Sequence, residues 1–185
     1  MPSQTKLTKT SFEEALTSDS LKTTRIIQLA LLSASFLFTI AVVLVFLQHQ
    51  DLRATQADLD KVRTLTIIHL VFLAFALISA RFQASRIFSA NSLSVTTPEP
   101  DLRAFAQKCV GLQRTAILIR LASMEGASFF GLAICIIAAT NGALVSEPYY
   151  WINLISVIVF LVFGIATFPT KERLVDSFER NFRQT

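Results

Sequence analysis

A carboxylate inside an apolar segment is the feature of this chain with the greatest capacity for chemistry. Glu125 lies in an apolar stretch at 115–140, about ten residues, or ~15 Å of helix, after its start. A charge at that depth of a bilayer costs about 2.5–3.5 kcal/mol even on insertion scales, so such a residue usually has a function and a partner. We favour a carboxyl hydrogen-bonded between helices to hold a bundle together, and the alternative is a proton or cation site.

Three other ionisable residues lie in or beside apolar stretches. Arg120 precedes Glu125 by five positions, roughly 140° around a helix, so the two side chains do not pair readily. The long side chain of Arg120 can instead extend toward the lipid headgroups on the inner side of the membrane. His49 ends the first apolar stretch, and His69 lies near the start of the second. A metal or haem between them is one alternative, but no carboxylate or cysteine motif accompanies them. We therefore expect no metal and no cofactor, and a hydrogen bond between helices for His69.

Several function classes are disfavoured by missing motifs. Cys109 and Cys135 are 26 positions apart on one predicted helix, or ~39 Å, and cannot form a disulfide within one chain. The sequence has no CxxC pair, glycine-rich phosphate loop, HExxH or GxSxG motif. We therefore expect no enzyme. The net charge of +4 resides at the ends of apolar blocks, which argues against nucleic-acid binding.

The composition and patterning of the chain predict that membrane helices carry these residues. Of 185 residues, 52% are hydrophobic and 16% charged, against roughly 25% charged in soluble domains, and the mean hydropathy is +0.54. Four apolar stretches approach the ~20 residues that a helix needs to cross a bilayer: 26–47, 64–80, 115–140 and 150–168. The second is expected to continue as helix past Arg81. The first starts too late, and is too long, for a signal peptide. This predicts an all-α integral membrane four-helix bundle.

Basic residues orient these spans. Three lie on the predicted outer side, Arg53, Lys61 and Arg63, and thirteen on the predicted inner side: Lys6, Lys9, Lys22, Arg25, Arg81, Arg86, Arg103, Lys108, Arg114, Lys171, Arg173, Arg180 and Arg183. This excess favours both termini in the cytoplasm, with a tail at 1–25, a transmembrane domain at 26–168 and residues 169–185 inside. Tyr149, Tyr150 and Trp151 begin the fourth span and are expected to anchor it at the outer interface. A bacterial inner membrane is the expected location.

Two segments on the inner side have amphipathic spacing. One follows Pro100 and repeats apolar residues at Leu102, Phe105, Cys109 and Leu112. We expect it to lie on the membrane surface and to bend near Gly111 into the third span. The other, in the tail, places four apolar residues on one face: Leu174, Val175, Phe178 and Phe182. An interfacial helix is favoured there, and docking on a partner subunit is the alternative.

The third span also carries small residues at close-packing intervals. Ala122 with Gly126, and Ala127 with Gly131, are small-xxx-small pairs, so we expect this span to be the most enclosed.

The second and fourth spans share a short internal repeat: residues 71–78 and 159–166 are identical at four of eight positions at an offset of 88. Duplication of a helical hairpin and chance recurrence explain this echo equally well. Duplication predicts pseudo-two-fold packing of the two hairpins.

The stretch from Ile117 to Ala127, with Phe168-Pro169-Thr170 after the fourth span, resembles small four-span bacterial membrane proteins of uncharacterised function. The resemblance covers mainly the second half of the chain and implies no activity. Together these features predict a non-enzymatic structural or accessory subunit, in a homo-oligomer or a larger membrane complex. Its partners are then the lipid bilayer and other membrane subunits or itself, with no nucleic acid. The alternative is a proton- or ion-coupled transport element that uses Glu125.

Overall fold

The computed structural model describes residues 13–14, 16, 18–92 and 102–182, and these described residues form helices and turns without a strand. The elements are α2 (Ser18–Gln48), α3 (Gln56–Ser92), α4 (Leu102–Thr140), α5 (Ala143–Ser146), the 3-10 helix η1 (Pro148–Leu154), α6 (Ile155–Ala166) and α7 (Lys171–Phe182). Four segments are long and apolar enough to cross a membrane: 21–48, 56–80, 107–140 and 148–166. The predicted all-α bundle of four membrane helices is confirmed.

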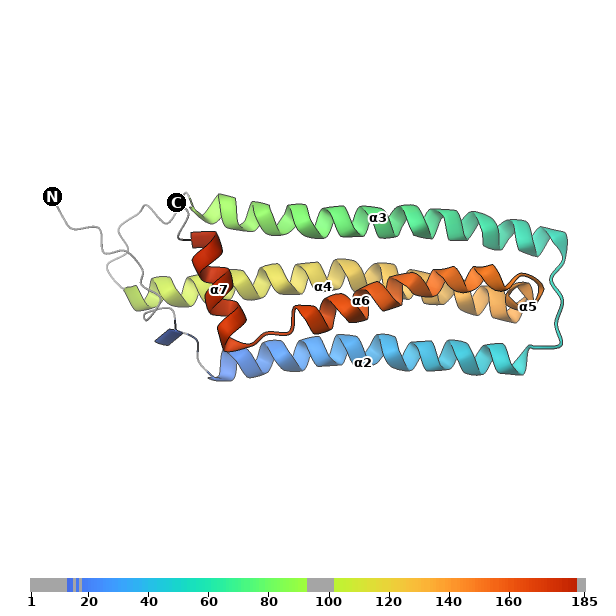
Figure 1. Ribbon diagram of the computed structural model, residues 1–185, viewed down its shortest axis with the longest axis horizontal. Helices are drawn as coiled ribbons and strands as arrows, with labels where there is room; N and C mark the ends of the chain where they lie inside the picture. The colour runs from blue at the N-terminus through green and yellow to red at the C-terminus, as the bar shows by residue number, and fades with distance from the viewer. Residues whose placement is uncertain (1–12, 15, 17, 93–101, 183–185) are drawn as a thin grey trace.

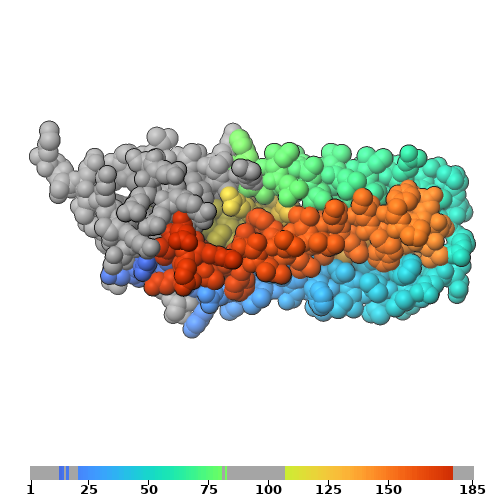
Figure 2. All heavy atoms as spheres, in the orientation of Figure 1, coloured from blue at the N-terminus to red at the C-terminus, as the bar shows by residue number. Residues whose placement is uncertain are grey.

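The four long elements run lengthwise, and α4 lies at their centre (Figure 1). α2 and α4 run in the same direction, and α3 and η1–α6 return in the opposite one. α4 packs against each of the other three, whereas α2 and α3 share no extensive contact. One face of the molecule shows α6 between α2 and α3 (Figure 2). α4 and α6 therefore form a packed hairpin but α2 and α3 do not, which is unlike the pseudo-two-fold packing that duplication predicts.

Helix boundaries differ from the predicted spans mainly at their polar ends. α2 starts at Ser18 rather than at 26, and α3 extends from Gln56 through Arg81 to Ser92. Helical hydrogen bonding continues into flanking polar sequence because a helix is not limited to the apolar residues that cross a bilayer. The expected continuation of the second span past Arg81 is confirmed.

The expected bend before the third span is not observed. α4 is one helix from Leu102 to Thr140 that continues through Gly111 (Figure 1). The predicted surface segment is thus the first part of the membrane helix, and its Cys109 is buried against the rest of the chain. The side chains of Leu102 and Phe105 lie outside the described residues. A glycine lowers helix propensity by only about 1 kcal/mol, which tertiary packing overrides.

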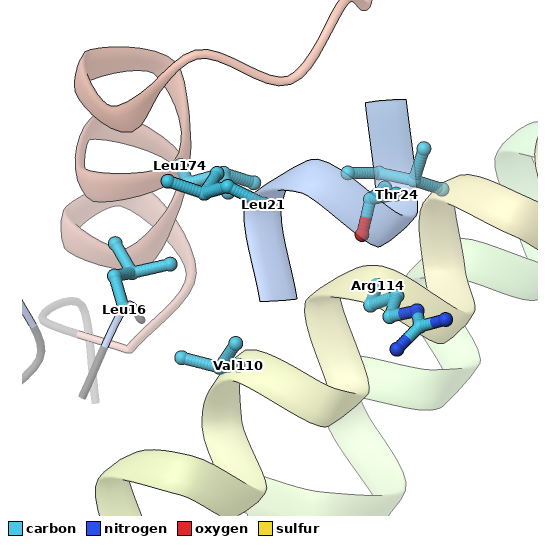
Figure 3. Close-up of a pocket in the computed structure, with 7 residues that line it drawn as sticks. Leu16, Leu21, Thr24, Val110, Arg114 and Leu174 are labelled. Atoms are coloured by element: carbon cyan, nitrogen blue, oxygen red, sulfur yellow. The ribbon is translucent and has the colours of Figure 1, made fainter. Parts of the chain in front are cut away.

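The predicted amphipathic tail is α7, and it crosses one end of the bundle (Figure 1). Leu174 and Val175 are buried against Leu16 and Cys109, so this apolar face docks on the chain's own helices. Leu16, Leu21, Val110 and Leu174 converge around a small cavity of about 10 Å³ (Figure 3). The side chains of Phe178 and Phe182 lie outside the described residues.

Polar contacts join α7 to the helix ends beside it. Gln113 Nε2 donates to the Leu174 carbonyl at 3.2 Å, and Arg25 Nε donates to the Pro169 carbonyl at 2.9 Å. Arg173 donates to the Ala166 carbonyl at 2.6 Å, where α6 ends and its last carbonyls lack helical partners. The turn between α6 and α7 is therefore held in place by side-chain hydrogen bonds.

Candidate functional site

Glu125 is half-buried on α4, well inside the membrane-spanning segment. It shares a side of the helix with Ala122, three positions earlier, and Phe129, four positions later. The described residues give Glu125 neither a hydrogen bond nor an ion pair. The expected hydrogen bond between helices is therefore not seen, although the position of the carboxylate inside a span is as predicted.

Beside Glu125, α4 presents an exposed stripe of small side chains. We call Thr115, Ala122, Gly126 and Ala133 the open face, since all four are exposed and lie within ~40° of one another around the helix. A Cβ built on Gly126 meets nothing within 4 Å. The pair Ala122 and Gly126 therefore makes no close contact within this chain, contrary to its predicted role in packing here.

The open face differs from the exposed faces of the other spans. α2, α3 and α6 expose many large apolar side chains, among them Phe36, Phe75 and Val162, whereas Ile137 is the one exposed large apolar residue among the described side chains of α4. Large side chains fill the lipid-facing surface of a membrane helix, and small ones allow another helix backbone to approach closely. The open face therefore has the composition of a helix-packing surface.

The second small pair does pack inside the chain. Ala127 is fully buried with Leu73 and Ala76 of α3. A Cβ on Gly131 would collide with the Asn153 carbonyl oxygen and would lie 2.6 Å from Ser156 Oγ. Glycine is therefore needed where α4 meets η1. Half of the most hydrophobic window of α4 is buried, the largest share of the four spans, so the expectation that this span is the most enclosed is confirmed.

Gly131 adjoins a buried polar network that joins α3 to η1. His69 Nδ1 lies 2.9 Å from Asn153 Oδ1, and the Asn153 amide donates to Thr66 Oγ1 and to the Tyr150 carbonyl, both at 2.9 Å. Since that amide oxygen accepts, His69 Nδ1 carries the hydrogen. The interhelical hydrogen bond predicted for His69 is confirmed. Asn153 was missed, although an amide within an apolar span was a readable signal.

The three aromatic residues of η1 have three different environments. Tyr149 is 54% exposed, as expected of an interface anchor. Tyr150 is 1% exposed and donates its hydroxyl to the Leu59 carbonyl at 3.0 Å, so it belongs to the core. Trp151 is half-buried, with its ring 5.1 Å from that of Phe46. The anchor prediction fails for Tyr150 because the 3-10 helix places it on the same side as Asn153, three positions later.

Two buried hydroxyls lie near the depth of Glu125. The rings of Phe38 and Phe129 are 5.6 Å apart and fix the alignment of the parallel helices α2 and α4. Ser35 is ~4.5 Å of helix before Phe38 and Glu125 is ~6 Å before Phe129, so their depths agree within ~1.5 Å. Ser128 is the residue before Phe129. Ser35 Oγ and Ser128 Oγ are buried without a hydrogen-bond partner among the described residues. These two buried serine residues were not identified from the sequence.

The remaining candidates do not converge on one centre. Arg120 is half-buried and projects from a different side of α4 than Glu125. His49 Nδ1 contacts the Val45 carbonyl at 2.8 Å within its own helix, and His69 is bound to Asn153. Among the described residues, no three His, Cys, Asp or Glu side chains are grouped to hold a metal ion.

Glu125 and the open face therefore form the candidate site, and its arrangement suits binding of another helix better than bond-making chemistry. Comparison with known proteins gives no match, since no family model, curated protein or solved structure is similar to this chain.

Proposed function

We propose that this protein is a non-enzymatic accessory subunit of a membrane complex and that it assembles through the open face of α4. The observation that carries the proposal is the composition of this face, with small side chains at Ala122, Gly126 and Ala133 where the other spans expose mainly large ones. Helices associate in lipid mainly by close packing, which small residues permit. Leaving such a face in contact with lipid forgoes that packing.

The proposed setting is a bacterial inner membrane, with α7 and both termini in the cytoplasm. Lys22, Arg25, Lys171 and Arg173 lie at the α7 end of the bundle, and the loop between α4 and η1 carries no basic residue. Basic residues concentrate on the cytoplasmic side of bacterial membrane proteins. Cysteine accessibility at Lys171 and at Val145 to a membrane-impermeant thiol reagent, applied to intact cells and to inverted vesicles, tests the orientation.

Large side chains placed on the open face test the assembly proposal. Gly126→Leu and Ala133→Leu are expected to reduce the mass of the particle extracted in native lipid nanodiscs, because each leucine blocks close approach. Ala74→Leu is the matched control, since Ala74 is exposed on α3. Native mass spectrometry and light scattering give the mass. A wild-type particle that holds one chain alone, unchanged by both open-face substitutions, contradicts the proposal.

A second candidate function is a proton- or ion-coupled transport element at Glu125. The observation that favours it is the pair of buried hydroxyls, Ser35 and Ser128, near the depth of the carboxylate. Proton or cation flux into vesicles containing the purified protein, compared between wild type and Glu125→Gln, separates the two candidates. Flux that is lost in Glu125→Gln while particle mass is unchanged supports transport. Zero flux with wild type, together with a particle mass that differs between wild type and Glu125→Gln, supports assembly.

A further inference from the structure

Among the described residues, the carboxylate of Glu125 has no donor. The described residues offer it neither a hydrogen bond nor an ion pair, and Ser123, two positions away, donates its hydroxyl to the Ile119 carbonyl at 3.0 Å. Arg120 lies ~7.5 Å along the axis and roughly 140° around the helix from Glu125. A carboxylate at mid-depth without a donor is costly in lipid. A donor supplied by another molecule removes this cost.

The neighbouring surface indicates that this donor comes from a helix. Ala122 and Gly126, on either side of Glu125 in the sequence, are exposed and leave space for a helix backbone. Small residues at a helix contact shorten the distance between the helix axes below the usual 8–10 Å. A side chain of a partner helix that rests on Ala122 and Gly126 can therefore reach the carboxylate of Glu125. Packing and charge thus coincide at one position of α4.

The same geometry disfavours a second copy of this chain as the partner. Two copies in one membrane share their orientation, so a symmetric dimer through α4 is related by a two-fold axis along the membrane normal. That axis places residues of equal depth opposite each other, so Glu125 would face Glu125 of the second copy. Two like carboxylates at mid-depth repel each other, whereas a cationic side chain complements either one.

We propose that the open face of α4 binds a transmembrane helix of a different protein, and that a Lys or Arg at mid-depth of that helix pairs with Glu125. This inference rests on the proposed assembly function and names the chemistry of the partner. It predicts that the partner is recognised by charge as well as by shape.

Synthetic transmembrane helices are the probe. Three peptides share one leucine–alanine host sequence and carry Lys, Leu or Glu at the central position. Each is labelled with an acceptor dye and mixed in phosphatidylcholine vesicles with the full chain, which carries a donor fluorophore on an amino-terminal tag. Energy transfer as a function of peptide-to-lipid ratio gives the binding constants. The chains compared are wild type, Glu125→Gln, Gly126→Leu and the control Ala74→Leu.

For wild type, the Lys peptide is expected to bind about tenfold more tightly than the Leu peptide, the range of one strong polar contact between membrane helices. The Glu peptide is expected to bind least tightly. Glu125→Gln should remove the preference for Lys, Gly126→Leu should weaken binding of all three peptides, and Ala74→Leu should change neither. Circular dichroism of each variant in the same vesicles confirms that the fold is retained.

Two results overturn the inference. Equal binding of the Lys and Leu peptides to wild type shows that Glu125 does not select charge. Binding of the Glu peptide as tight as that of the Lys peptide indicates a pair of carboxyls that share a proton, as a second copy would provide. Neither result decides the proposed assembly function, because that function is tested by the native particle mass and its response to Gly126→Leu, which do not depend on these peptides.

Discussion

The junction of α4 and η1 offers the sharpest test of the structure, through the substitution Gly131→Ala. The added Cβ would collide with the Asn153 carbonyl oxygen, and would lie 2.6 Å from Ser156 Oγ and 2.8 Å from His69 Cε1. The first of these is a backbone atom, so η1 must move away from α4 to admit the methyl group. That movement also strains the 2.9 Å contact between His69 and Asn153.

The expected magnitude follows from three contributions. Overpacking of a well-packed core costs about 1–3 kcal/mol. Loss of one interhelical hydrogen bond in a membrane protein costs about 0.6–2 kcal/mol. Alanine regains about 1 kcal/mol of helix propensity over glycine. Gly131→Ala should therefore lower the free energy of unfolding by about 2 kcal/mol. The matched control is Gly126→Ala, whose Cβ meets nothing within 4 Å, and it should raise that free energy by up to ~1 kcal/mol.

Unfolding in mixed dodecyl maltoside and sodium dodecyl sulfate micelles measures both variants. Circular dichroism reports helix content, and the fluorescence of Trp151, the one tryptophan of the chain, reports the environment of η1. The two alanine variants should differ by about 3 kcal/mol, with Gly131→Ala the less stable, by the same packing and propensity values. If they unfold within 0.5 kcal/mol of each other, about the scatter expected of neutral substitutions, the close approach of α4 and η1 is refuted.

Three further substitutions probe the polar contacts. Asn153→Leu should lower the free energy of unfolding by about 1–3 kcal/mol, because it leaves buried partners on α3 unsatisfied; a variant as stable as wild type contradicts the buried network. Arg25→Ala removes a hydrogen bond to Pro169 and a ring contact with Phe168, so α7 should exchange amide hydrogens faster while the spans do not; unchanged exchange argues against the contact. Hydrogen bonds from the Glu172 backbone amide and Thr170 hold the pKa of Glu172 below its ordinary value of 4.5. The stabilisation of α7 by the ionised carboxylate is therefore fully present above pH 4.5 and is lost as the pH falls through the lowered pKa. Glu172→Gln should abolish this acid sensitivity of α7, measured by the mobility of a spin label on that helix; an identical pH response in the variant refutes it.

The four spans can be read directly from the amino-acid sequence, because about 20 consecutive apolar residues have few stable arrangements other than a helix across a bilayer. The sequence also placed Glu125 within a span, and predicted the hydrogen bond of His69, because a polar group in an apolar segment needs a partner. These inferences depend on local composition, which can be read along the chain. Which partner His69 would find was not readable, since Asn153 is 84 positions away.

Which side of each helix is covered by other helices depends on how the chain packs, and it could not be read from the sequence. The two small-residue pairs of α4 look alike in sequence, yet Ala127 and Gly131 pack against α3 and η1 while Ala122 and Gly126 form the open face. Tyr150 is buried because of the 3-10 geometry of η1, which no apolar pattern signals. Periodicity defines the faces of a helix, but lipid and protein are both apolar, so hydrophobicity cannot distinguish a face against lipid from one against another helix. That ambiguity is why Glu125, located correctly from sequence, finds no partner among the described residues of its own chain.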